Sequence, residues 1–321
     1  MSFKILILLG AGCWVLGAGC WVLSAGCWGG RVNETDKTLG IICAGVGGWD
    51  LGFQLAGWRA RWQIELDDVN RHCLADRFPE SRQFKNLNDW RSYALPRVRC
   101  IAFSSPCQDL SVMGAARVNK ERQGLSGERS GLFFECMEII GAVGPEFVVF
   151  ENVPNLLYSN DGRDLQAVVQ SFAERGYLGA ARVVDSSAFG IPQKRRRLLL
   201  VARLGQEPPP EFMADAGPME PLPCAAGSSW VAKPAHAWAG YTLTAPDKHN
   251  RCNSRINLGS ELFVAEEDRW DQMADRSRAA EVHGFPRGLD ATNTEEAYAA
   301  GNAMPPPMAK WIAEILNRAI A

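Results

Sequence analysis

Residues 39–56 read LGIICAGVGGWDLGFQLA. The run 39–43 is apolar and has the length of a buried strand, and residues 44–48 form a glycine-rich turn. Beyond the turn, apolar residues recur at helical spacing until Gly57. A strand, a glycine-rich turn and a helix in this order predict the opening unit of an α/β domain, in which backbone amides of the turn can approach a ligand closely.

An acidic residue strengthens this interpretation of the turn. Glu65 lies 20 positions after Gly45, at the end of the next apolar run. A carboxylate at the end of the second strand can accept hydrogen bonds from ribose hydroxyls. The glycine-rich turn together with Glu65 therefore indicates a nucleoside cofactor, whereas the glycines alone are equally typical of a tight turn.

Short apolar runs alternate with helical patterns as far as about residue 203. The predicted strands are residues 61–64, 98–103, 147–150 and 197–202, and the predicted helices are residues 68–77, 131–142 and 164–175, with a last helix at 308–321. This alternation predicts an α/β fold with a mostly parallel sheet, whose chemistry gathers at the carboxyl ends of the strands. Those ends carry the glycine-rich turn, Glu65, Cys107 and Glu151.

The composition excludes several classes of protein. Hydrophobic residues make up 47% of the 321 residues and charged residues 22%, which excludes wholesale disorder. A net charge of −2, from 34 basic and 36 acidic residues, disfavours a sequence-blind nucleic-acid coat, so any nucleic acid must bind a local basic face. The 10 cysteines include no CxxC pair, which predicts a reduced, cytoplasmic protein without a metal cluster.

The N-terminus differs from the rest of the chain. Residues 9–29 are three consecutive heptads of the type LGAGCWV, and residues 5–28 carry no charge. This segment suits a tandem duplication outside the fold, although a membrane span or an export signal would also be apolar. We expect residues 1–38 to be an extension outside the fold, residues 39–204 with 286–321 to form the main α/β domain, and residues 205–285 to hold a proline-rich linker and a small second domain.

Three polar segments stand where chemistry is expected. Residues 106–108 read Pro-Cys-Gln in a loop after a strand, where a partly exposed thiol can be activated, although most cysteines are inert small hydrophobes. Glu151 ends an apolar strand, where desolvation would raise its pKa toward neutrality, unless it is a helix cap or a solvated acid. Residues 193–197, Gln-Lys-Arg-Arg-Arg, would point alternate side chains into the cleft or form a solvated face.

Taken together in chain order, these segments resemble the motifs of the C5-cytosine-specific DNA methyltransferases that depend on S-adenosylmethionine. The matching motifs are AGVGG with DLGF, the acid in IELD, PCQDLS, GERSGLFFE, ENVPNLL, FGIPQKRRR, GFP and GNAMPPP, and they extend from residue 39 to the C-terminus. The resemblance implies a Rossmann-like methyltransferase sheet with a small, irregular target-recognition domain. The alternative within the same fold is a tRNA cytosine-5 methyltransferase, and a catalytically silent, membrane-tethered protein is an alternative from another class.

The resemblance also implies a role for each matching residue. Cys107 corresponds to the nucleophile, Glu151 to the proton donor, and Arg195 and Arg197 to the arginines of the site. The implied S-adenosylmethionine site comprises Ala44, Gly45, Gly47, Gly48, Glu65, Leu66, Asp89, Trp90, Pro106, Asn302 and Ala303, the implied substrate contacts are Gln108 and Gln193, and no metal is implied.

The implied reaction explains these residue types. Addition of a Cys107 thiolate to C6 of cytosine, with Glu151 at N3, would make C5 nucleophilic enough to take a methyl group. The base must first leave the duplex, and a basic loop at residues 117–129 would close over it. One departure concerns residues 41–43, Ile-Ile-Cys in place of the commoner Asp-Leu-Phe, which removes an aromatic contact to adenine.

The expected partner is double-stranded DNA, read by basic residues within 228–270, with a cognate restriction endonuclease as a possible companion. We expect a monomeric protein without an obligate protein partner.

Overall fold

The computed structural model describes residues 36–105, 132–189, 195–213 and 303–321 with their side chains, and four further strands by their backbone alone. The further strands are β1 (Ser2–Leu9), β2 (Gly12–Gly19), β10 (Phe263–Glu266) and β11 (Arg269–Gln272). The sheet strands are β3 (Thr38–Ile42), β4 (Arg59–Ile64), β5 (Arg82–Phe84), β6 (Cys100–Ser104), β7 (Phe147–Asn152), β8 (Tyr177–Asp185) and β9 (Arg196–Leu204). The α-helices are α1 (Gly48–Leu55), α2 (Asp68–Arg77), α4 (Leu132–Val143), α5 (Arg163–Glu174) and α8 (Pro306–Ala319).

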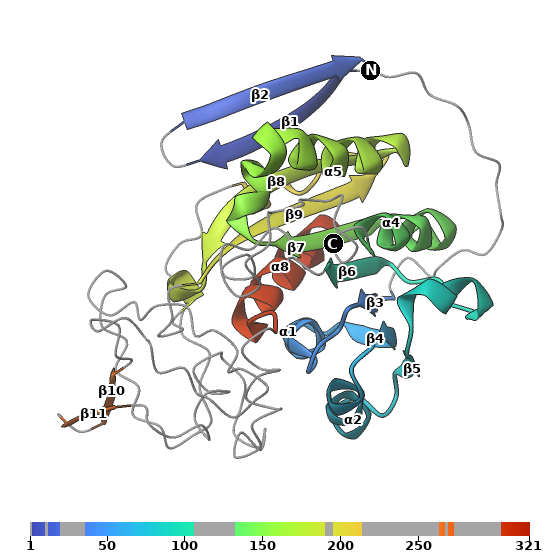
Figure 1. The fold of residues 1–321 in the computed structure, drawn as a ribbon, viewed down its shortest axis with the longest axis vertical. Helices are drawn as coiled ribbons and strands as arrows, with labels where there is room; N and C mark the ends of the chain where they lie inside the picture. Colours follow the sequence, from blue (N-terminus) through green and yellow to red (C-terminus); the bar gives the residue numbers. More distant parts are fainter. Residues whose placement is uncertain are drawn as a thin grey trace.

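The sheet is mostly parallel, as the sequence predicts. Its strand order is β2-β1-β8-β9-β7-β6-β3-β4-β5, and β5, β4, β3, β6 and β7 run parallel to one another (Figure 1). Strand β9 is antiparallel to both β7 and β8. The parallel strands therefore bring their carboxyl ends to one edge of the sheet, and this edge carries the site.

Among strands β3 to β9, two have no counterpart in the predicted ones. Strand β5 is three residues long, too short for an apolar pattern to reveal it. Strand β8 reads YLGAARVVD and alternates only partly between buried and half-buried positions. Its pairing with β9 across nine residue pairs stabilises it, so tertiary contacts rather than local propensity decide its conformation.

Strands β1 and β2 form an antiparallel hairpin at the β8 end of the sheet. Strand β1 pairs with β8 through two residue pairs, Ile7 with Ala181 and Leu8 with Arg182. By comparison, β8 and β9 pair along their full length. The expectation that residues 1–38 lie outside the catalytic fold stays a prediction, and the same holds for the other two domain boundaries.

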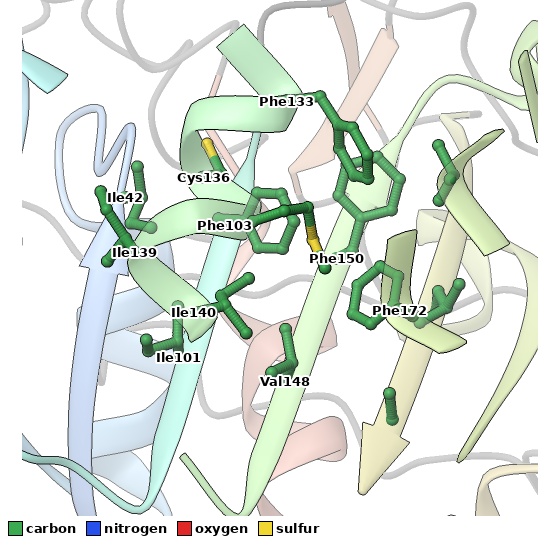
Figure 2. Close-up of a cluster of buried hydrophobic side chains, with 14 of the residues drawn as sticks. Ile42, Ile101, Phe103, Phe133, Cys136, Ile139, Ile140, Val148, Phe150 and Phe172 are labelled. Carbon is green, nitrogen blue, oxygen red and sulfur yellow. The ribbon is translucent and has the colours of Figure 1, made fainter. Parts of the chain in front are cut away.

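Strict alternation along the strands builds a core on each face of the sheet. On one face, Ile42, Phe103 and Phe150 pack with Phe133 and Ile140 of α4, which Figure 2 shows in close-up. The same core extends to α5. All these side chains are fully buried, as is expected for central strands covered by helices on both faces.

The other face is covered by α1 and α8 (Figure 1). There Leu39 and Ile41 of β3 and Val149 of β7 pack with Phe53 of α1 and Ile312 of α8, all with no exposed area. Neighbouring residues of one strand, such as Ile41 and Ile42, thus belong to different cores because successive side chains point to opposite faces.

Helices α1 and α8 are far apart in the sequence and in close contact in space. A Cβ atom added to Gly52 would lie 2.4 Å from the Cβ of Ala309. At the other end of α1, the indole of Trp58 donates to Asn317 Oδ1 at 2.9 Å, and Asn317 Nδ2 donates to the Ala56 carbonyl at 2.9 Å. The C-terminal helix therefore packs directly against the helix that follows the glycine-rich turn.

Candidate active site at the carboxyl edge of the sheet

The glycine-rich turn follows β3 directly and has left-handed backbone geometry. Cys43 has a φ of 56°, Gly45 of 58° and Gly47 of 90°. Left-handed geometry is accessible to glycine without strain, which explains two of the glycines. The turn is anchored to the neighbouring strand, because the Ala44 amide donates to the Ile64 carbonyl at 3.2 Å.

Glu65 contacts this turn through its side chain. Its Oε2 accepts a hydrogen bond from the Gly45 amide at 2.7 Å, and its Oε1 accepts from the Asp67 amide at 3.0 Å and from Asn70 Nδ2 at 3.3 Å. The Glu65 carboxylate thus joins the turn after β3 to the end of β4. Because an ionised carboxylate has about four acceptor positions, it retains capacity for a ligand hydroxyl.

Packing leaves no room for a side chain at position 48. A Cβ atom built there would lie 1.9 Å from the Met304 carbonyl oxygen, which precedes α8. Gly47 is also confined, because an added Cβ would lie 2.5 Å from the Phe78 ring. Gly45 differs from both, since a Cβ added there would have no heavy atom of the described residues within 4 Å, which leaves room for a ligand beside this part of the structure.

The other predicted cofactor residues lie along the same edge of the sheet, after β4 and β5. Leu66 is 65% exposed, and Asp89 is exposed in the 3-10 helix η1 (Leu87–Ser92). Trp90 is half-buried against the α4-side core, and its indole donates to Glu135 Oε2 at 3.2 Å. This hydrogen bond fixes the Trp90 ring to α4. The guanidinium carbon of Arg91 lies over the same ring, 4.7 Å from its centroid.

Three described cysteines have raised pKa values: Cys43 in the turn, Cys100 at the end of β6 opposite to the site, and Cys136 in α4. Burial, with a smaller effect of Glu65, raises the pKa of Cys43 to about 12. Burial also raises the pKa values of Cys100 and Cys136 well above the usual range. Because a thiolate is the reactive form, none of these three is suited to be a nucleophile at neutral pH.

Glu151 lies near the end of β7 and is 8% exposed. The strand extends through Asn152, two residues beyond the predicted end at Phe150, because Glu151 and Asn152 pair with Leu199 and Leu198 of β9. Glu151 Oε1 accepts from Arg197 Nε in an ion pair of 2.7 Å. The structure thus brings two predicted catalytic residues into direct contact.

A second polar contact joins the end of β7 to the residue that follows β6. Asn152 Nδ2 donates to Ser105 Oγ at 3.4 Å, and Asn152 Oδ1 accepts from the Val153 amide at 2.8 Å. Asn152 and Ser105 are 1% and 4% exposed. Sequence reasoning assigned neither residue a role, although both follow apolar strand runs, which was the available signal.

Arg195 occupies a different environment from Arg197. It is 2% exposed, its Nη2 donates to the Ala303 carbonyl at 3.1 Å, and its amide donates to Asp185 Oδ1 at 3.2 Å. The guanidinium therefore contacts the segment that precedes α8. Arg195 brings the predicted residue Ala303 next to β9, a contact between residues 108 positions apart.

Five predicted site residues fall outside the described part of the chain. They are Pro106, Cys107, Gln108, Gln193 and Asn302. The basic loop at residues 117–129 also lies outside it, as does most of the expected recognition segment.

The described ranges contain neither a membrane-spanning helix nor a metal-binding cluster. No helix there combines the length and the apolar character needed to cross a membrane. Among the same residues, no group of three or more His, Cys, Asp or Glu side chains could hold a metal ion.

Solved methyltransferase structures share this fold. The Entamoeba histolytica methyltransferase EhMeth superposes with a TM-score of 0.62 over 89% of this chain and 99% of its own, at 14% identity. A DNMT2 mutant from Spodoptera frugiperda gives a TM-score of 0.58 over 88% of this chain and 100% of its own, also at 14% identity. At 14% identity, these two comparisons show a shared fold and nothing further.

The chain belongs to the C-5 cytosine-specific DNA methylase family, whose model matches residues 40–221. Its relatives include the type II methyltransferase M2.BsuMI of Bacillus subtilis (strain 168), 34% identical over 171 residues, which are 52% of this chain and 42% of the relative. The orphan methyltransferase M.SPRI of Bacillus phage SPR is 29% identical over 171 residues, which are 53% of this chain and 37% of the relative. The chain thus spans less than half the length of these two relatives.

Proposed function

We propose that this protein is a DNA (cytosine-5-)-methyltransferase that transfers a methyl group from S-adenosylmethionine to C5 of a flipped-out cytosine. The observation that carries the proposal is the ion pair of Glu151 and Arg197 at the carboxyl edge of the sheet, whose side chains are 11% and 14% exposed. It is joined by membership of the C-5 cytosine-specific DNA methylase family.

The described residues fit S-adenosylmethionine. The open position at Gly45 leaves room for a ligand beside the turn, and the adjacent Glu65 carboxylate can accept from ribose hydroxyls. Leu66, with 65% exposure, offers an apolar surface for a purine ring. When bound, the cofactor supplies an electrophilic methyl group on its sulfonium.

Each catalytic side chain then has a defined task. Arg197 orients the Glu151 carboxyl through its Nε, so that Glu151 can hydrogen-bond N3 of cytosine and hold a proton there. The Cys107 thiolate adds to C6 of the ring, and this covalent addition makes C5 nucleophilic. Ser105 and Asn152 position the start of the Cys107 loop relative to Glu151. Arg195, the second arginine of the proposed site, also holds the segment before α8 through the Ala303 carbonyl.

The finer expectations belong to the same proposal. The substrate is double-stranded DNA, from which the base is flipped because a stacked cytosine is out of reach of a thiol. The enzyme acts as a cytoplasmic monomer, either with a cognate restriction endonuclease or as a phage or standalone enzyme of the kind that the orphan relative represents. The presence of type II methyltransferases among the relatives supports the endonuclease companion.

The test is methyl transfer from labelled S-adenosylmethionine to duplex DNA of mixed sequence, with tRNA in a parallel reaction. Label in 5-methylcytosine of DNA is the expected result. Label in tRNA alone would overturn the DNA assignment and favour the RNA enzyme of the same fold. Glu151→Gln is the matched control, because it keeps the shape of the side chain and removes its acid.

A further inference from the structure

A second carboxyl lies buried beside the proposed cofactor site. Asp50 in α1 is 2% exposed, and Gln63 in β4 is 0% exposed. Gln63 Nε2 donates to Asp50 Oδ1 at 2.5 Å. The other two polar atoms, Asp50 Oδ2 and Gln63 Oε1, are buried and have no hydrogen-bond partner among the described residues. Orphaned buried acceptors are rare in folded proteins and call for an explanation.

The two orphaned atoms are the remaining members of one possible ring. A carboxylic acid and a primary amide can form two hydrogen bonds to each other, one from the amide N–H and one from the acid O–H. A single proton on Oδ2 supplies the missing donor and satisfies both acceptors. We propose that Asp50 is a neutral carboxylic acid that donates from Oδ2 to Gln63 Oε1, and that this closed pair positions the glycine-rich turn against Glu65.

The location of the pair gives it this role. Asp50 lies in the first turn of α1, two residues after Gly48, and Gln63 lies two residues before Glu65. The pair therefore joins the same two elements that meet in the hydrogen bond from the Gly45 amide to Glu65. Asp50 acts through these groups as a positioning residue, and this role rests on the proposed cofactor site.

The electrostatics agree with a neutral acid. Burial raises the pKa of Asp50 to about 7, although its hydrogen bond from Gln63 and one from the backbone act in the opposite direction. Asp50 is the single ionisable residue of α1, and β3 has none. The ionisable groups of the other packed elements are the exposed Arg59 and Arg61 of β4 and, on α8, the exposed Arg318 and the Lys310–Glu314 ion pair.

The pair should therefore respond to pH. Above about pH 7, Asp50 loses its proton, and a carboxylate then faces the Gln63 carbonyl oxygen without a donor between them. Two buried acceptors in contact are unfavourable, so the pair opens and the turn loses its fixed position relative to Glu65. Cofactor affinity should fall as the neutral fraction of Asp50 falls.

The experiment is calorimetric titration of the full chain with S-adenosylmethionine between about pH 6 and pH 9, with wild type and Asp50→Asn side by side. With the pKa at about 7, wild type should bind about tenfold more weakly at pH 8 than at pH 6, because apparent affinity scales with the competent fraction. Asp50→Asn can donate its amide proton to Gln63 at every pH. Its affinity should stay at the wild-type value of pH 6 throughout.

A second measurement tests the proton directly. Infrared difference spectra between about pH 6 and pH 9 should show the carbonyl stretch of a protonated carboxyl in wild type. This band should be missing in Asp50→Asn. An unchanged band in Asp50→Asn, or the same loss of affinity with pH in both proteins, would overturn the proposal. Absence of cofactor binding at every pH would overturn the cofactor site and the positioning role, while the infrared band would still decide whether Asp50 holds the proton.

Discussion

Arg197 Nε lies 2.7 Å from Glu151 Oε1, across the antiparallel pairing of β9 with β7. The two side chains are 14% and 11% exposed, so the contact is largely shielded from water. Since the charge of Glu151 is partnered, its burial at the end of an apolar strand is tolerated. The same contact fixes the direction of the carboxyl toward the edge where cytosine would bind.

Arg197→Lys should separate orientation from charge. Lysine keeps the positive charge but presents no planar Nε donor, so the Glu151 carboxyl loses its fixed direction. We expect kcat for methyl transfer to fall by about 10- to 100-fold, and Glu151→Gln to lower it by about 100-fold or more. Affinity for S-adenosylmethionine, measured by calorimetry, should be unchanged in both variants. A selective loss of cofactor affinity would place the pair in the cofactor site instead.

Glu65→Ala should weaken S-adenosylmethionine binding by about 1–3 kcal/mol, the usual cost of a lost hydrogen bond to a charged group. The variant also leaves the Gly45 amide without its acceptor, so part of the loss comes from the turn. Calorimetry of wild type, Glu65→Ala and Glu65→Gln separates the contributions, since glutamine retains an acceptor. Equal affinity in all three proteins would remove Glu65 from the cofactor site.

Gly48→Ala should destabilise the fold, because its new methyl group meets the Met304 carbonyl oxygen. Overpacking of this kind costs about 1–3 kcal/mol, or more where the backbone cannot move. Gly57→Ala is the matched control, since it has a φ of 84° and open space around its Cβ, so that only backbone strain of about 1–2 kcal/mol applies. Urea denaturation measures both. A larger loss in Gly57→Ala would contradict the packing argument.

Duplex DNA with 5-fluorocytosine at the target should trap the enzyme in a denaturant-resistant adduct. Fluorine at C5 cannot leave as a proton, so the thioether between Cys107 and C6 persists after methyl transfer. The adduct should require S-adenosylmethionine and disappear in Cys107→Ser, because a hydroxyl is a far poorer nucleophile. Cys43→Ser is the control and should still form the adduct, since the Cys43 pKa of about 12 keeps that thiol neutral. An adduct that survives Cys107→Ser would refute the mechanism.

A chain that starts near Val32 should fold and bind cofactor normally. Strands β3 to β9 form a continuous seven-stranded part of the sheet, and β1 adds two residue pairs to its β8 edge. We expect the thermal midpoint and the cofactor affinity of this shorter chain to match those of the full chain. An insoluble or inactive product would make the heptad segment a necessary structural element.

The order of elements and the family motifs could be predicted from the amino-acid sequence. Apolar runs and helical periodicity locate β3, β4, β6, β7, β9 and the five α-helices of the described ranges to within a few residues, because those signals are local. Glu65 and Glu151 were also identified from their positions at strand ends, since the ends of parallel strands meet at one edge.

The contacts between distant residues, by contrast, depend on the folded chain. The role of Gly48 depends on a carbonyl 256 positions later in the chain, and that of Arg195 on one 108 positions later. Likewise, the Asp50–Gln63 pair requires α1 and β4 to pack together before either residue is buried. Side-chain packing and desolvation arise only when distant segments of the chain come together, so no local sequence pattern predicts them.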